Sequence, residues 1–217
     1  LGAGQLAPIF GENMTGTDMM TSLGYRLEDL GETNFIAAEK LVALNDAQRQ
    51  VVAMLSNDAL VHLQVRDDLD SGTEDASFGG QTYFALPADG DGAEKLMNRM
   101  VKAYDNTNER FIEMVSPAGF ETTSKYNYGT LGTLINNRLY VSTSDTEVDS
   151  VFMVHIGSPA DIADNTNEIT YLSDSAQQAI VEMAESLLWR QDNKQSRSQV
   201  AKQNAIEIIT SINQLGV

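Results

Sequence analysis

The sequence feature that most constrains the fold is the change in the period of the apolar residues along the chain. They recur every three or four positions over residues 19–30, 41–55, 176–188 and 200–212, and strand-like alternation appears between. A period near 3.6 residues places side chains on one helix face, whereas a period of two places them on one strand face. The chain is therefore predicted to contain two helices, a strand-rich segment and two further helices.

The first two helices are predicted over residues 17–31 and 34–58. Asp18 lies in the first turn of the first helix, where its charge suits the positive end of the helix dipole, and Gly31 is predicted to end that helix. Asn34 is the predicted N-cap of the second helix. The core-facing stripe of the second helix consists of Leu41, Leu44, Gln48, Val51, Val52 and Leu55.

The middle of the chain is predicted to form a small antiparallel sheet. Hairpins are expected at residues 105–108 and at Asn136-Asn137, because asparagine tolerates the positive φ of a tight turn. Residues 67–80, rich in Asp, Gly and Ser, are predicted to form an acidic loop. The predicted strands cover residues 60–65, 82–86, 96–104, 110–115, 133–135, 138–142 and 148–156.

These elements predict an α+β fold, an antiparallel bundle of about four helices with an inserted small antiparallel β region. The C-terminal helices are expected to begin at Ser173-Asp174 and near Ser196. The expected divisions are an extended N-terminal arm (1–16), a first helical pair (17–58), the inserted β region (59–172) and a C-terminal helical pair with a tail (173–217).

The net charge of the chain limits the kinds of partner that the protein binds. The chain has 31 acidic and 14 basic residues, a formal net charge of −17. Such a chain does not bind nucleic acid by releasing counterions from phosphates, although DNA is able to pass beside it without specific binding. Solubility or high-salt adaptation is the simplest interpretation of the charge. The chain has no cysteine, which excludes disulfides and thiolate metal sites and fits a reducing cytoplasm.

No residue pattern predicts catalysis, a metal or a cofactor, so the protein is predicted to be non-enzymatic. The two histidines, His62 and His155, are interpreted as strand residues rather than catalysts. Asp89 begins a DGDG stretch, but the residues after it break the spacing of an EF-hand calcium loop. Trp189, the only tryptophan, is interpreted as a core residue, with an interface anchor as the alternative.

Three stretches resemble the head-to-tail adaptor proteins of tailed bacteriophages, also called connector or neck proteins. The first is similar to the family's Asn-acid-Ala-Gln-Arg run and consists of Asn45, Asp46, Ala47, Gln48 and Arg49. The second, YFALPAD at residues 83–89, resembles an aromatic-x-Leu-Pro-x-Asp strand end and precedes a PAGFE element at residues 117–121. The third is the C-terminal helix pair from residue 171, where Ser173 replaces the family's proline. The resemblance covers most of residues 17–214 and depends on the order and spacing of these short motifs.

The resemblance implies a structural virion protein that forms a homo-oligomeric ring, commonly of twelve copies. Such a ring binds the portal protein of the capsid, contacts tail or nozzle proteins, and extends the channel used in DNA ejection. The implied location is the neck of the virion after synthesis in the host cytoplasm, with no membrane involved.

Two candidate surfaces follow from the resemblance. Apolar residues near the end of the chain exceed what one helix face needs and are predicted to dock on the portal, namely Ile208, Ile209, Ile212, Leu215 and Val217. Acidic residues of the predicted loop are predicted to line the channel and repel DNA, namely Asp67, Asp68, Asp70, Glu74 and Asp75. The N-terminal arm is predicted to become ordered by wrapping a neighbouring subunit.

Three other interpretations remain open. A different tail or neck completion protein would share the same plan and differ in its binding partner. A non-enzymatic α+β module would bind a peptide or a sugar on the sheet, through a preformed pocket in a monomer. An enzyme that uses carboxylates or a metal would require a stoichiometric divalent metal ion.

Overall fold

The computed structural model describes residues 13–70, 72–75, 81–86, 99–123, 129–136, 138–142 and 148–215. The chain divides into two compact units, and each is described by itself. One unit is formed by Leu1–His62 and Pro159–Val217, so it contains both ends of the chain, and the other is Leu63–Ser158. Most of the expected N-terminal arm, residues 1–12, lies outside the described residues.

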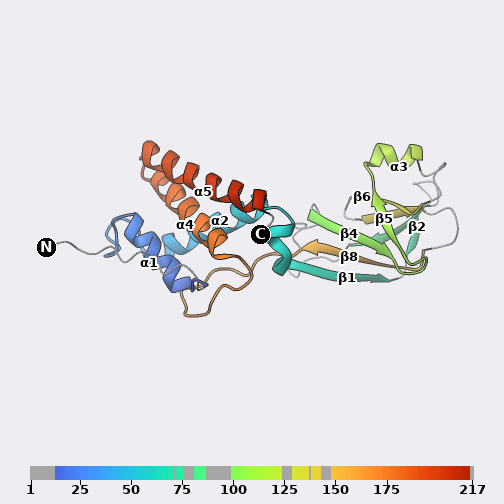
Figure 1. Ribbon diagram of the computed structural model, residues 1–217, viewed down its shortest axis with the longest axis horizontal. Helices are drawn as coiled ribbons and strands as arrows, with labels where there is room; N and C mark the ends of the chain where they lie inside the picture. Colours follow the sequence, from blue (N-terminus) through green and yellow to red (C-terminus); the bar gives the residue numbers. More distant parts are fainter. Residues whose placement is uncertain are drawn as a thin grey trace. The chain divides into compact units, whose positions relative to one another are not determined.

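Four long helices build the first unit (Figure 1): α1 (Gly16–Arg26), α2 (Ala37–Met54), α4 (Asp174–Gln191) and α5 (Gln195–Leu215). Helix α4 is the central one, because it packs against α1, α2 and α5. Its buried residues therefore extend around much of its circumference, including Gln177, Glu182 and Ser186. Trp189 is 3% exposed, which places it in the core as expected.

The predicted start of α4 is confirmed by its cap. The Ser173 side chain accepts a hydrogen bond from the backbone N–H of Ala176, so the helix begins at Asp174. Helix α1 begins with a capping box, in which Thr15 and Asp18 each accept a hydrogen bond from the other's backbone N–H.

The predicted end of α1 at Gly31 is wrong, because the helix ends at Arg26. Glu28 adopts a left-handed φ of 55°. The N–H of Glu28 donates to the carbonyl of Tyr25, and the N–H of Asp29 donates to that of Gly24. These two bonds form a Schellman motif, with glutamate in the position that glycine usually occupies.

The predicted N-cap of α2, Asn34, is also wrong. The backbone N–H groups of Thr33, Asn34 and Phe35 all donate to the buried carboxylate of Asp29. Although burial alone would raise the pKa of Asp29, these bonds and that of the Thr33 hydroxyl outweigh it and hold the pKa well below its usual range. Helix α2 therefore begins only at Ala37, after this turn.

The second unit contains an eight-stranded sheet, with strand order β1-β8-β4-β5-β6-β7-β3-β2. All described pairs are antiparallel except β5 and β6, which pair in parallel at Glu113 and Met114. The sheet is thus large and mixed, which corrects the prediction of a small antiparallel region. The strands are β1 (Gln64–Asp70), β2 (Thr73–Asp75), β3 (Gln81–Ala85), β4 (Met100–Asp105), β5 (Arg110–Met114), β6 (Leu131–Ile135), β7 (Arg138–Ser142) and β8 (Ser150–Ile156).

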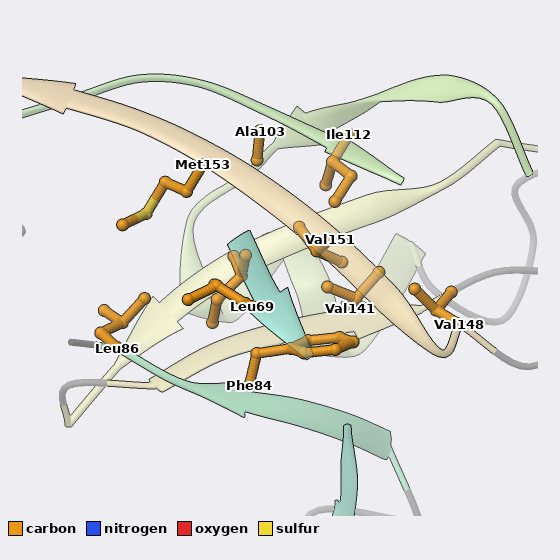
Figure 2. Close-up of a cluster of buried hydrophobic side chains, with 10 residues drawn as sticks. Leu69, Phe84, Leu86, Ala103, Ile112, Val141, Val148, Val151 and Met153 are labelled. Carbon is orange, nitrogen blue, oxygen red and sulfur yellow. The ribbon is translucent and has the colours of Figure 1, made fainter. Parts of the chain in front are cut away.

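The sheet is curled, as strands from distant places in its order contribute side chains to one core. Leu69 on β1 and Phe84 on β3 belong to the same buried cluster, although β1 is the first strand and β3 the seventh. Figure 2 shows these side chains converging with Val151 and Met153 of β8. A smaller cluster, formed by Phe120 of α3 (Pro117–Thr123) with Leu131 and Tyr140, packs separately.

Two local predictions for the β region are wrong. Residues 60–65 were expected to form a strand, but Asp58–Leu63 is a 3₁₀ helix that contains His62, and β1 starts at Gln64. The 3₁₀ segment is kinked at Leu60, which has a φ of −111° and a ψ of 25°, and both Leu60 and Leu63 are buried. The described part of the expected acidic loop is largely strand, because Asp67, Asp68 and Asp70 lie in β1 and Glu74 and Asp75 lie in β2.

Both predicted hairpins are confirmed. Strands β4 and β5 pair across residues 105–110, with Asp105 opposite Arg110. Strands β6 and β7 pair around the second turn, where Asn136 has a φ of 49°. The predicted strands over residues 82–86 and 148–156 correspond to β3 and β8, so His155 is a strand residue as expected.

Candidate functional site

The run at residues 45–49 lies in the middle of α2 and fixes the segment where the chain re-enters the helical unit. The Asn45 side chain accepts a hydrogen bond from the N–H of Ile162 at 2.7 Å and donates one to the carbonyl of the same residue at 3.0 Å. The Gln48 amide donates to the carbonyl of Ala160 at 2.8 Å. Positions three residues apart share one helix face. One face of α2 therefore holds the backbone of residues 160–162, the α2 clamp.

Two further groups complete the α2 clamp. Arg49 bridges Asp46 on its own helix and Asp161 on the held segment, and all three side chains are exposed. The Tyr171 hydroxyl donates to the carbonyl of Ala160, and burial raises the pKa of Tyr171 above its ordinary value. These hydrogen bonds and the surface ion pair position the backbone of residues 160–162, and the side chain of Ile162 is buried.

The start of α1 packs against the next part of the same segment. The N–H of Thr17 donates to the carbonyl of Asn165 at 3.1 Å, and its hydroxyl donates to the Asp164 carboxylate. Gly16 lies so close that a Cβ atom there would be 1.8 Å from the carbonyl oxygen of Ala163. The segment is therefore held between α2 on one side and α1 on the other.

The clamp gives a direct prediction for Asn45→Ala. The change removes both bonds to Ile162, so the free energy of unfolding of the helical unit should fall by about 1–3 kcal/mol. Trp189 fluorescence during urea denaturation reports this unit, because the only tryptophan is buried in it. Asp46→Ala is the matched control, since it removes only an exposed ion pair and should cost less than about 1 kcal/mol. Equal effects of the two changes would contradict the clamp.

The predicted channel-lining acids point to different partners. Asp67 contacts the buried His155, with a distance of 2.5 Å between its Oδ2 and the histidine Nε2. Asp68 pairs with Arg66 at 2.8 Å. Asp75 accepts a hydrogen bond from the Tyr140 hydroxyl at 2.7 Å and pairs with Arg138. Glu74 is exposed, and the side chain of Asp70 lies outside the described part. Three of the four acids whose side chains are described thus have partners within the β unit, and lining a channel remains a prediction.

The interpretation of the last helix as carrying surplus apolar surface is corrected. Ile209 and Ile212 are only 4% and 6% exposed, so they belong to the core of the helical unit. Asn213 beside them donates to the carbonyl of Met54 and accepts a hydrogen bond from the N–H of Ser56. Ile208 is half-buried, and the side chains of Leu215 and Val217 lie outside the described residues. Docking on the portal stays a prediction, and removal of residues 212–217 would damage the core.

Sequence reasoning missed a fully buried polar side chain that connects several parts of the helical unit. Gln177 is fully buried, and its amide donates to the carbonyls of Ile169 and Leu172 while its oxygen accepts the N–H of Met14. It joins α4 to the distant residue Met14 and to the segment directly before the helix. The available signal was a glutamine on the otherwise apolar face between Ala176 and Ile180.

Neither metal chemistry nor a membrane segment has support in the part of the chain that the structure covers. No group of three or more His, Asp or Glu side chains there could hold a metal ion. None of its helices is long and apolar enough to cross a bilayer. Comparison with known proteins adds no relative, since no family model and no curated protein matches this chain.

Proposed function

We propose that this protein is a subunit of a homo-oligomeric ring that joins the portal of a tailed-bacteriophage capsid to the tail and extends the DNA channel. The observation that carries the proposal is the placement of the three resembling stretches. The run at residues 45–49 forms the α2 clamp, residues 117–121 form most of α3, and α4 begins directly after Ser173. The first and third stretches and the PAGFE element thus coincide with defined elements, and the described part of the second stretch, residues 83–86, lies at the end of β3.

The architecture and the charge support the same proposal. Both chain ends build one helical unit and the middle builds a β unit, which is the plan that the resemblance implies. In this proposal the four long helices form an antiparallel bundle that faces the portal. The excess of 31 acidic over 14 basic residues suits a channel wall that repels DNA at short range.

The proposal is tested by mixing the purified chain with the portal protein encoded beside its gene. The ring subunit should join the portal in a stable complex, seen as added mass in light scattering. A different neck or tail completion protein would ignore the portal and bind a tail protein instead, and a binding module would remain monomeric with both.

A further inference from the structure

An aromatic row crosses the outer face of the β unit. It consists of Phe111 on β5, Tyr104 on β4 and Phe152 on β8, which lie opposite one another in the sheet register. The rings of Phe111 and Tyr104 meet edge to face at 5.2 Å, and those of Tyr104 and Phe152 stack at 5.0 Å. The guanidinium of Arg66 on β1 lies over the Phe152 ring, 4.1 Å from its centroid. Four adjacent strands, β1-β8-β4-β5, therefore share one continuous surface.

The aromatic row is separate from the core of the sheet. The neighbours of its residues along the strands, such as Ala103, Ile112 and Val151, belong to the buried cluster (Figure 2). Because successive residues of a strand face opposite sides, the row points away from that cluster. Phe111 is 66% exposed although aromatic. A contiguous aromatic surface of this kind marks an interaction site more often than an isolated exposed side chain does.

The charged groups beside the row balance one another. Residues two positions apart in a strand share a face, so Lys102 lies beside Tyr104 and Glu113 beside Phe111. Arg66 and Asp68 complete the border on β1, and all four charged residues are exposed. Among the residues whose side chains the structure describes, this face therefore has two cations and two acids, whereas the whole chain has a net charge of −17.

The charges of this face indicate which molecule binds to it. Two copies of a chain this acidic repel each other wherever their acidic surfaces approach within the Debye length of about 8 Å. That repulsion is smaller at the aromatic row, where a cation of one copy is able to meet an acid of another. Nucleic acid does not fit, because Asp68 and Glu113 border the rings and offset the two cations.

We infer that the aromatic row is the surface through which one copy of this chain associates with another. The rings form the dry centre of the contact, and Arg66, Asp68, Lys102 and Glu113 form its polar rim. Because the same surface meets itself, this contact is two-fold and joins copies in pairs, so it is additional to the contact that closes the ring of the proposed function. Self-association of the chain itself does not depend on that function.

The test is sedimentation velocity of the full-length chain alone, from about 1 µM to about 500 µM, a range that covers weak protein contacts. The wild-type chain should show a concentration-dependent rise in mass. Phe111→Ser should weaken this association at least thirtyfold, roughly the effect of removing an interface hot spot. Val42→Ser is the matched control, because Val42 is similarly exposed at 62% but lies on α2. Circular dichroism should show all variants folded, since both positions face solvent.

A second variant tests the rim. Lys102→Glu makes the face net negative and should weaken association more strongly at low salt than at high salt. A wild-type chain that stays monomeric over the whole range would overturn the inference, as would association that Phe111→Ser leaves unchanged. A rise in mass that needs the portal and is lost in Phe111→Ser would also overturn it, since the row would then bind the portal. Association through Phe111 without portal binding would instead refute the adaptor proposal and leave the inference standing.

Discussion

Replacing Asp105 by alanine should destabilise the β unit by about 3–5 kcal/mol. This carboxylate is fully buried at the end of β4. Its Oδ1 accepts the backbone N–H groups of Thr107 and Asn108, both at 3.0 Å. Its Oδ2 accepts the Asn108 side-chain amide at 2.8 Å and lies 4.0 Å from Nε of Arg110. The change removes the acceptor around which the β4–β5 turn is built.

The effect of Asp105→Ala should be visible as faster hydrogen exchange of the amides in β4 and β5. The Trp189 urea transition should change much less, because that tryptophan belongs to the other unit. Asp149→Ala is a suitable control, since this exposed acid lies next to β8 and should cost less than about 0.5 kcal/mol. A loss below about 1 kcal/mol for Asp105→Ala would show that the turn forms without its carboxylate.

Replacing Gly16 by alanine should destabilise the helical unit by at least about 3 kcal/mol. Helix propensity alone predicts that Gly16→Ala would stabilise the unit, because alanine is favoured over glycine within a helix by about 1 kcal/mol. The new Cβ would meet the carbonyl oxygen of Ala163 at 1.8 Å, which is a backbone atom and not a movable side chain. The α2 clamp holds the neighbouring residues 160–162, so the segment has little freedom to withdraw.

Gly31→Ala is the matched control for Gly16→Ala. A Cβ at Gly31 would meet only a side-chain atom of Thr33, at 4.0 Å. This variant should be neutral or slightly stabilising, since it reduces the freedom of the unfolded chain. Urea denaturation followed by Trp189 fluorescence distinguishes the two variants. A stabilising effect of Gly16→Ala would mean that helix propensity, and not the contact with Ala163, controls this position.

Predictions from the sequence succeeded where a short local pattern decides the structure. The Ser173 cap and the hairpin turn at Asn136 depend on a few neighbouring residues, and both appear in the structure. The α2 stripe is confirmed except at its start, where Leu41 is half-buried and Lys40, expected to point away from the stripe, is buried. The predictions failed where a distant or buried polar group competes with the local sequence pattern. Asn34 does not cap α2, because it lies in the turn around the Asp29 carboxylate and the helix begins only at Ala37.

The charged strand β1 shows a second limit of structure prediction from the sequence. Asp67 and Asp68 look like loop residues by composition, yet β1 is the edge strand of the sheet, where charged residues discourage pairing with other chains. Alternation then sends Asp67 toward His155 and Asp68 toward Arg66. The parallel pairing of β5 with β6, which joins two antiparallel parts into one sheet, has no signature in a single sequence.

For the candidate site, sequence analysis identified helix α2 but did not predict that it binds residues 160–162. Residues 45–49 were singled out by resemblance alone, and only the fold shows that Asn45 and Gln48 face residues 160–162 across more than a hundred positions of sequence. The aromatic row was missed because its members come from three separate strands whose pairing sets the row. The burial of Ile209 and Ile212 likewise depends on how the helices pack.

The measurement that tests the central claim most directly is the mass of the chain, by multi-angle light scattering, alone and after mixing with its neighbouring portal protein. The adaptor account predicts a complex with equal numbers of chain and portal subunits. Asn45→Ala, if folded, should still form this complex, because the α2 clamp acts within one subunit. A chain that leaves the mass of the portal unchanged at every ratio would contradict the account.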